Sequence, residues 1–272
     1  MKRDEIKICV LRVGGTNCDA ETKRSFEALG VQTEIVHVNL LVKRRNLLDY
    51  SALVFPGGFS YGDYVRAGAI WAKLIMAKLG KEMKAFADEN RLILGICNGF
   101  QVLVEAGLLP GFEGVSAYPE AALATNVPPG YNCRWIGLRH ENEGKCVFTW
   151  TIPKGKVLRV PVAHGEGRFM FAKEKEKQLL ERLYENDQLV FRYCNVKGEY
   201  AEGGYPANPN GSFHDIAGIC NPEGTVFGLM PHPERAFYWW QTPDWTRQGN
   251  MSEYGDGKLI FESLVTYLEK KG

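Results

Sequence analysis

Strand-like and helix-like segments alternate over the first hundred residues, and this alternation limits the chain to few folds. The apolar, β-rich runs are 6–13, 33–38, 52–55 and 91–96, and the helix-like runs are 19–30, 65–89 and 99–107. A strand, a helix and a second strand in succession form a unit whose strands are parallel and whose helix covers the sheet. We therefore predict an α/β fold with a doubly wound, mostly parallel sheet.

The pattern changes after residue 110. Short β-rich runs separated by turn residues then occupy 133–140, 145–152, 156–164 and 189–196. The stretch 215–230 has the form of a hairpin with its turn at 221–224, and apolar residues recur at helical spacing in 257–272. We predict an antiparallel β extension of the sheet. Because no linker, repeat or low-complexity tract interrupts the chain, we expect one domain spanning 1–272.

Charge and cysteine content exclude several classes of protein. The 33 basic and 32 acidic residues give a net charge of +1, so nothing favours binding to nucleic acid or to an anionic membrane. No apolar run approaches the about 18 residues of a membrane span, and the first 13 residues lack a signal-peptide core. Seven cysteines without a C-x-x-C pair predict reduced thiols in the cytoplasm, with no disulfide framework and no metal site.

A cysteine lies at the joint between a strand-like run and a helix-like run, in "LILGICNGFQVL" (92–103). The spacing of Gly95, Cys97 and Gly99 is that of a nucleophile elbow in which cysteine replaces serine. Such an elbow turns so sharply that only glycine fits two positions either side of the nucleophile. The alternative is a buried cysteine beside two incidental glycines, so Cys97 needs partners to be a nucleophile.

Two histidines each head an H-x-E triplet. His232 follows the apolar run "TVFGLM" and is bracketed by prolines in "PHPE", so it lies at a strand end with Glu234 on its own side. His164 and Glu166 lie among glycines in "HGEGR", which we expect to be a mobile loop without an assigned chemical role. The alternative for either triplet is a solvated histidine beside an unrelated acid. Cys97 with His232 and Glu234 is the set that predicts an acyl-transfer or hydrolase site.

An oxyanion hole requires two backbone N–H donors, and two segments can supply them. Asn98 follows the cysteine, and Gly58 lies in "VFPGGFSYG" after the strand 52–55. A plain turn is the alternative for the second segment. Neither a G-x-x-x-x-G-K-[ST] nor a G-x-G-x-x-G motif occurs, so no nucleotide site is expected in this chain.

With "PGG", "GICNGFQ" and "PHPE" in this order, the chain resembles the triad-type class I glutamine amidotransferases. It resembles more narrowly the glutaminase subunits, called subunit I, of phosphoribosylformylglycinamidine synthase. The segments that carry this narrower resemblance cover nearly the whole chain: "GTNCD" (15–19), "FPGGFSYGDYVRAGAIWA" (55–72), "GICNGFQ" (95–101), "HGEGRF" (164–169) and "NPNGSFHDIAGICNPEGTVFGLMPHPERA" (208–236).

The resemblance implies hydrolysis of L-glutamine to glutamate and ammonia through a γ-glutamyl thioester. Cys97 would be the nucleophile, His232 the base and Glu234 the acid that orients the base, while Gln101 would help seat glutamine unless it is an ordinary helix residue. The ammonia would pass to a separate synthetase subunit that uses ATP and magnesium, with a small bridging subunit joining the two. No cofactor is implied in this chain itself.

The chain departs from compact members of the family in three places. The first loop reads "LRVGGTNCD" where Phe-Pro more often precedes the motif, and segments at about 112–145 and 237–257 are longer. The second segment is rich in aromatic residues, either as core beneath the last helix or as a docking patch for the synthetase subunit. Two functional alternatives remain open, a stand-alone cysteine hydrolase or glutaminase of the same fold and a non-catalytic regulatory homologue.

Overall fold

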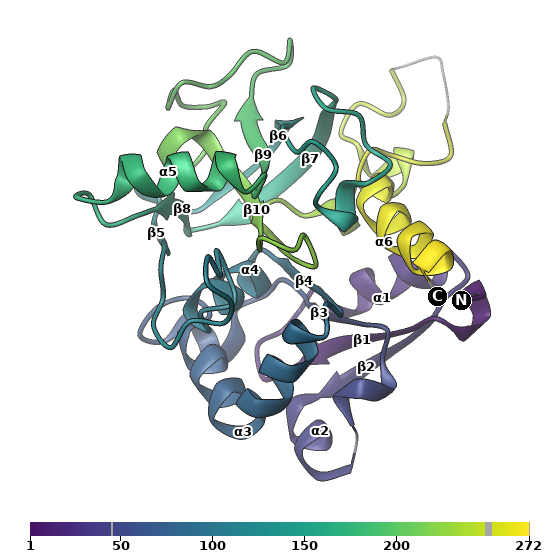
Figure 1. Cartoon of the computed structure of the whole chain (residues 1–272). Coiled ribbons are helices and arrows are strands. Elements are labelled where there is room, and N and C mark those ends of the chain that lie inside the picture. Colours follow the sequence, from purple (N-terminus) through teal and green to yellow (C-terminus); the bar gives the residue numbers. More distant parts are fainter. Residues whose placement is uncertain (45, 248–251, 272) are drawn as a thin grey trace.

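A nine-stranded mixed sheet organises the chain, of which the computed structural model describes residues 1–44, 46–247 and 252–271 (Figure 1). Its strand order is β2-β1-β3-β4-β11-β10-β9-β6-β7. The parallel half contains β2 (Gln32–His37), β1 (Lys7–Arg12), β3 (Ala52–Phe55), β4 (Leu92–Ile96) and β11 (Val226–Leu229). The antiparallel half contains β10 (Ile216–Cys220), β9 (Leu189–Cys194), β6 (Asn132–His140) and β7 (Val157–His164). The predicted doubly wound sheet with an antiparallel extension is confirmed.

Helices pack on both faces of the parallel half, and α5 (Glu176–Glu185) lies beside the antiparallel strands (Figure 1). The other helices are α1 (Asp19–Glu27), α2 (Val38–Arg44), α3 (Ala69–Asp88), α4 (Asn98–Glu105) and α6 (Lys258–Lys271). Helix α1 contacts α6, and α3 contacts both α2 and α4. Among the described residues, no helix combines the length and the apolar character needed to cross a membrane.

The central strands β3 and β4 are buried along their whole length because helices cover them on both sides. Helix α4 lies close to the sheet where Phe100 contacts Gly228 of β11. A Cβ atom on Gly228 would lie 2.1 Å from the Phe100 ring, so only glycine admits this approach. Phe100 also stacks on Phe169, with 6.4 Å between ring centroids, and both rings belong to one hydrophobic core.

A two-stranded sheet of β5 (Ala122–Thr125) and β8 (Glu166–Met170) adjoins the main sheet. The mobile loop expected at "HGEGR" is therefore wrong, because most of this motif belongs to strands. His164 ends β7 and Glu166 begins β8. The Asn126 side chain donates to the His164 carbonyl and accepts from the Gly167 N–H, both at 2.9 Å. Because these backbone groups have fixed partners, the corner is part of the framework rather than a loose loop.

The strand expected at 145–152 is wrong. Residues Val147–Thr149 form a 3-10 turn, η4, that contacts α6. The Asn142 side chain accepts from the Cys146 N–H at 2.8 Å, and the Thr149 N–H bonds the Cys146 carbonyl at 3.1 Å. The apolar run is therefore buried as a turn, since local hydrogen bonds satisfy its backbone without a neighbouring strand.

The two long segments have different structures. Residues 112–145 contain β5 and β6, so this segment supplies a strand of the main sheet. In 237–257, Phe237 is buried against Phe261 of α6, with ring centroids 5.9 Å apart. Trp240 is 52% exposed and stacks on Tyr238 at 4.3 Å. The core interpretation therefore holds for Phe237, docking by Trp240 stays a prediction, and residues 248–251 lie outside the described part.

Replacing Phe100 with alanine should lower the free energy of unfolding by about 3–5 kcal/mol, because the ring fills the space between α4, Gly228 and Phe169. Urea denaturation followed by circular dichroism measures this change. Val196→Ala is the control, since Val196 is 97% exposed and its loss should stay within about 0.5 kcal/mol. Equal stability of the two variants would contradict the proposed core contact.

Candidate active site

Cys97 lies at the turn between β4 and α4, as the sequence predicted. Its backbone has φ 50° and ψ −105°, a conformation that residues with a side chain adopt only under strain. A Cβ atom on Gly99 would lie 1.8 Å from the Phe55 carbonyl oxygen, and one on Gly95 would lie 2.6 Å from Leu103. The two glycines thus permit the sharp turn, which fixes the thiol at the carboxyl end of β4.

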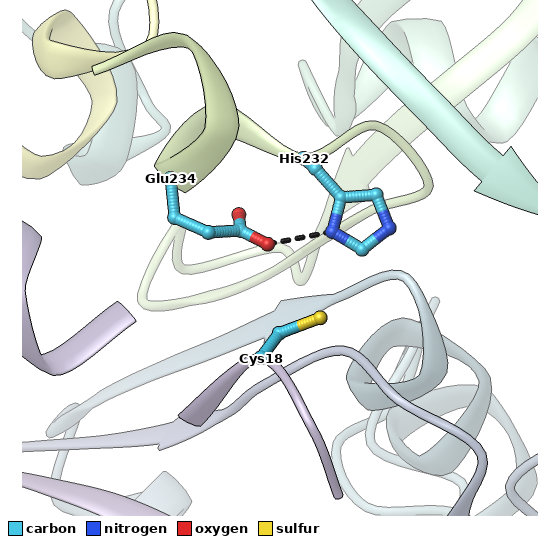
Figure 2. Close-up of side chains that lie close together, drawn as sticks. All are labelled: Cys18, His232 and Glu234. Carbon is cyan, nitrogen blue, oxygen red and sulfur yellow. Dashed lines mark hydrogen bonds and ion pairs between the residues drawn. The ribbon is translucent and has the colours of Figure 1, made fainter. Parts of the chain in front are cut away.

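His232 and Glu234 follow β11, the strand beside β4. Leu229 of β11 pairs with Ile96 of β4, so both chains leave the sheet at the same edge. His232 precedes the 3-10 turn η6 (Pro233–Ala236), which contains Glu234. Figure 2 shows the result: the imidazole and the carboxylate face each other, and Nδ1 lies 2.6 Å from Oε1. Since Glu234 accepts this hydrogen bond, the neutral ring has its lone pair at Nε2.

Burial and charge act on His232 in opposite directions. Burial disfavours its charged form, but the Glu234 and Cys97 charges and contacts with the Cys97 and Cys18 thiols together raise its pKa well above the ordinary value. Both side chains of the His232–Glu234 pair are almost completely buried. The Cys97 thiol donates to the Ala163 carbonyl at 3.7 Å. A histidine that readily takes a proton beside this thiol can stabilise a thiolate.

A second thiol, that of Cys18, lies beneath the same imidazole, in the loop before α1 (Figure 2). Its sulfur and the donor atoms of His232 and Glu234 lie within 4.8 Å of one another, and all three residues are buried. These donor types suit zinc, but the Arg235 Nη2 atom lies 3.2 Å from the Cys18 sulfur, where it would repel a cation. Burial raises the pKa of Cys18 to about 11, so this thiol stays protonated and is a poor nucleophile.

The two predicted oxyanion donors lie at the ends of neighbouring strands. Asn98 begins α4, so its N–H is one of the first four of a helix, which have no acceptor inside the helix. Gly58 lies three residues after the end of β3, at φ 151°. The Asn98 side chain accepts from the Ser60 N–H at 3.3 Å and so ties the elbow to the loop that contains Gly58. Asn98 directly follows Cys97 in the chain, and this hydrogen bond holds the loop that contains Gly58 next to the elbow.

Gln101 is buried one turn after Cys97, and protein groups contact both ends of its side chain. Its Nε2 donates to the Glu166 carbonyl, and its Oε1 accepts from Asn98 Nδ2 at 2.9 Å. Asn98 Nδ2 also lies 3.4 Å from Asp63 Oδ1. Burial and the Glu166 charge raise the pKa of Asp63 to about 6. Gln101 therefore holds the wall of the site formed by the beginning of β8.

His164 and Glu166 lie at this wall. The Glu166 Oε2 atom accepts the Ala67 N–H at 3.0 Å, and neither ring nitrogen of His164 has a hydrogen-bond partner among the described residues. Burial and the nearby His232 lower the pKa of His164 to about 3, so its ring is neutral. The sequence singled out this pair without a role, and the structure places both residues next to the predicted site.

Sequence reasoning missed Cys18, Asp63 and Arg235 as neighbours of the site. Cys18 and Asp63 lie within motifs that carry the family resemblance, "GTNCD" and "GGFSYGDYVRAGA", and Arg235 follows "PHPE" directly. The position of these three residues within or beside the family motifs was the sequence signal that could have identified them. Motif membership does not state which residue touches which, because these segments are far apart along the chain.

Comparison with known proteins identifies the family of this chain. Residues 5–268 match the family model of the CobB/CobQ-like glutamine amidotransferase domain. The phosphoribosylformylglycinamidine synthase subunit PurQ of Archaeoglobus fulgidus is 51% identical, over 99% of this chain and all of that protein. The chain belongs to the PurQ family. PurQ is the subunit that the sequence resemblance named subunit I, and the chain is accordingly an enzyme of the glutamine amidotransferase class.

Two further matches extend over the whole chain. PurQ of Methanococcus maripaludis is 42% identical, over 97% of this chain and 98% of its own. The structure of PurLQS from Thermotoga maritima matches with a TM-score of 0.72 and 34% identity, and covers 97% of this chain and 99% of the matched chain. The PurQ fold and the order of its elements are therefore shared along the full length.

Gly99→Ala should impair the elbow at Cys97, because the new methyl group would overlap the Phe55 carbonyl. We expect loss of most glutaminase activity and a free energy of unfolding lower by about 3 kcal/mol, the upper range for overpacking. Gly80→Ala in α3 is the matched control, since its Cβ would have no neighbour closer than 3.8 Å and alanine should stabilise the helix by up to about 1 kcal/mol. Wild-type activity in Gly99→Ala would contradict the elbow.

Asp63→Asn should stabilise the protein at pH 7.5 but not at pH 4.5. Because the folded pKa of about 6 exceeds the unfolded value, the unfolded state releases this proton first, and wild-type stability falls as pH rises from about 4 to 6. Asparagine removes that loss. The melting temperature at the two pH values measures the effect, with Asp88→Asn, an exposed position of α3, as control. A pH-independent difference would argue against a raised Asp63 pKa.

Proposed function

We propose that this chain is the glutaminase subunit of phosphoribosylformylglycinamidine synthase and that Cys97, His232 and Glu234 are its catalytic triad. The observation that carries the proposal is the position of a strained Cys97 elbow beside the hydrogen-bonded His232–Glu234 pair. Similarity over the full length to PurQ proteins supports the assignment of the enzyme complex.

In the proposed reaction, the Cys97 thiolate attacks the side-chain carboxamide carbon of glutamine. The carbonyl electrons move to oxygen, and N–H groups near Gly58 and Asn98 stabilise the oxyanion. Protonated His232 gives its proton to the nitrogen, the C–N bond breaks and ammonia departs. A γ-glutamyl thioester then remains on Cys97. His232 then takes a proton from water, whose oxygen attacks the thioester, and collapse of the second intermediate expels the thiolate and releases glutamate.

The wall of the site supports a role for Gln101 in seating glutamine. Gln101 accepts from Asn98 on one side and donates to the Glu166 carbonyl on the other, so it fixes the elbow that contains Cys97 to the beginning of β8. We assign this positioning role to Gln101 and keep the oxyanion role for Asn98 and Gly58.

Ammonia released here would pass to a separate synthetase subunit, which converts formylglycinamide ribonucleotide to the amidine with ATP and magnesium, while a small third subunit bridges the two. No cofactor is assigned to the chain itself, which we treat as one glutamine amidotransferase domain of residues 1–272. Its seven cysteines, which include no C-x-x-C pair, support a reducing, cytoplasmic location. Exposed Trp240, stacked on Tyr238, is the proposed contact with the synthetase subunit.

Glutamate release from glutamine tests the proposal. We expect low activity from the isolated chain, a rise of about tenfold or more with the synthetase subunit, its nucleotide substrate and ATP, and loss of activity in Cys97→Ala. Cys133→Ala, which changes an exposed cysteine of β6, should retain activity. Full activity without partners would favour a stand-alone glutaminase, and activity in Cys97→Ala would mean that another residue is the nucleophile.

A further inference from the structure

The loop of residues 14–19, which contains the "GTNCD" motif, contacts both the loop that follows β3 and His232. It takes no part in the reaction proposed above. Its backbone binds the loop that follows β3. The Cys18 N–H donates to the Gly57 carbonyl at 3.2 Å, and the Phe59 and Tyr61 N–H groups donate to the Gly15 and Gly14 carbonyls at 3.0 and 2.8 Å. The first loop therefore fixes the backbone around the proposed oxyanion donor Gly58.

The two loops fit so closely that their relative position has little freedom. A Cβ atom on Gly58 would lie 2.9 Å from the Asn17 nitrogen, and one on Gly15 would lie 2.1 Å from the Phe59 carbonyl oxygen. Both glycines have positive φ, at 151° and 90°. Any displacement of the first loop would thus move the oxyanion loop with it.

The Cys18 side chain points from this loop to the catalytic histidine (Figure 2). A Cβ atom on Gly57 would lie 2.7 Å from His232 Cε1 and 3.1 Å from the Cys18 sulfur. The imidazole and the thiol therefore both pack against the backbone of Gly57. The sulfur accepts a hydrogen bond from Arg235 Nη2 at 3.2 Å. The same guanidinium donates to Glu21 Oε1 of α1 at 2.8 and 3.0 Å, which anchors it to the first helix.

We propose that Cys18 is a positioning residue whose buried thiol holds the His232 imidazole in register with the oxyanion loop. The proposal rests on the proposed function, in which His232 must face Cys97 while Gly58 faces the developing oxyanion. One residue meets both demands, since its backbone binds Gly57 and its side chain contacts the imidazole. A neutral, polarisable thiol can do so without competing with Glu234 for the Nδ1 proton.

Cys18→Ala, Cys18→Ser and the control Cys133→Ala test this role. In Cys18→Ala the imidazole loses its support, so we expect kcat for glutamine hydrolysis to fall about tenfold with KM within about twofold, as for a misplaced catalytic group. Cys18→Ser keeps a polar group of similar shape and should recover most of the loss. Cys133→Ala should match the wild type in both constants.

A second measurement reads the contact without glutamine. Titration of ¹³Cε1-labelled histidines by NMR, with His232 assigned from a His232→Asn variant, should show a lower His232 pKa in Cys18→Ala, because the thiol contact raises it. Cys18→Ser should restore the wild-type titration. Merely structural damage would reduce activity without this selective shift and without rescue by serine.

A Cys18→Ala protein with wild-type kcat and an unchanged His232 titration would overturn the proposal. Loss of activity with an unchanged titration would also overturn it, because the imidazole would then not sense the thiol. Failure of the proposed function is recognised separately, by glutaminase activity that survives Cys97→Ala. The titration result stands in either case, because it does not depend on the substrate.

Discussion

The parallel pairing of β4 with β11 is the constraint on which the site depends. Because Ile96 pairs with Leu229, the elbow and the histidine segment leave the sheet at the same edge. Cys97 follows Ile96 by one residue, and His232 follows Leu229 by three. The Cys97 N–H then donates to the Leu229 carbonyl at 2.8 Å, which extends the hydrogen-bond ladder to Cys97 itself. The proposed nucleophile and base, separated by 134 intervening residues, are thus placed by one strand pair, and their side chains need only short turns to meet.

The elbow adds strain to that pairing. A cysteine at positive φ is costly, and the surrounding structure must over-determine it. Here Gly99 lets α4 approach the Phe55 carbonyl, while the Asn98 side chain bonds the loop beyond β3. Three neighbouring segments, the end of β3, the elbow and the first loop, hold one another at fixed distances. This arrangement explains why the glycine motifs cluster at strand ends.

The sequence predicts the parallel half and the placement of Cys97, His232 and Glu234 at strand ends because these depend on local signals: alternating runs, flanking glycines and a proline-bracketed triplet. It fails where tertiary contacts decide. The run 145–152 is β-rich, yet Asn142 and Thr149 satisfy it as a turn, and "HGEGR" is glycine-rich, yet Asn126 orders it. The contact of Cys18 with His232 joins residues more than 200 positions apart, which no local pattern encodes.

Strand β11 belongs to both halves of the sheet, since it pairs in parallel with β4 and antiparallel with β10. Detachment of the antiparallel half would therefore remove the hydrogen bonds between β10 and β11. The parallel half would then end in an unpaired edge strand. A partly unfolded molecule that had lost β10 would leave β11, the strand that leads to His232, without its antiparallel partner. Local unfolding of the antiparallel half and loss of the ordered segment that contains His232 are therefore coupled through β11.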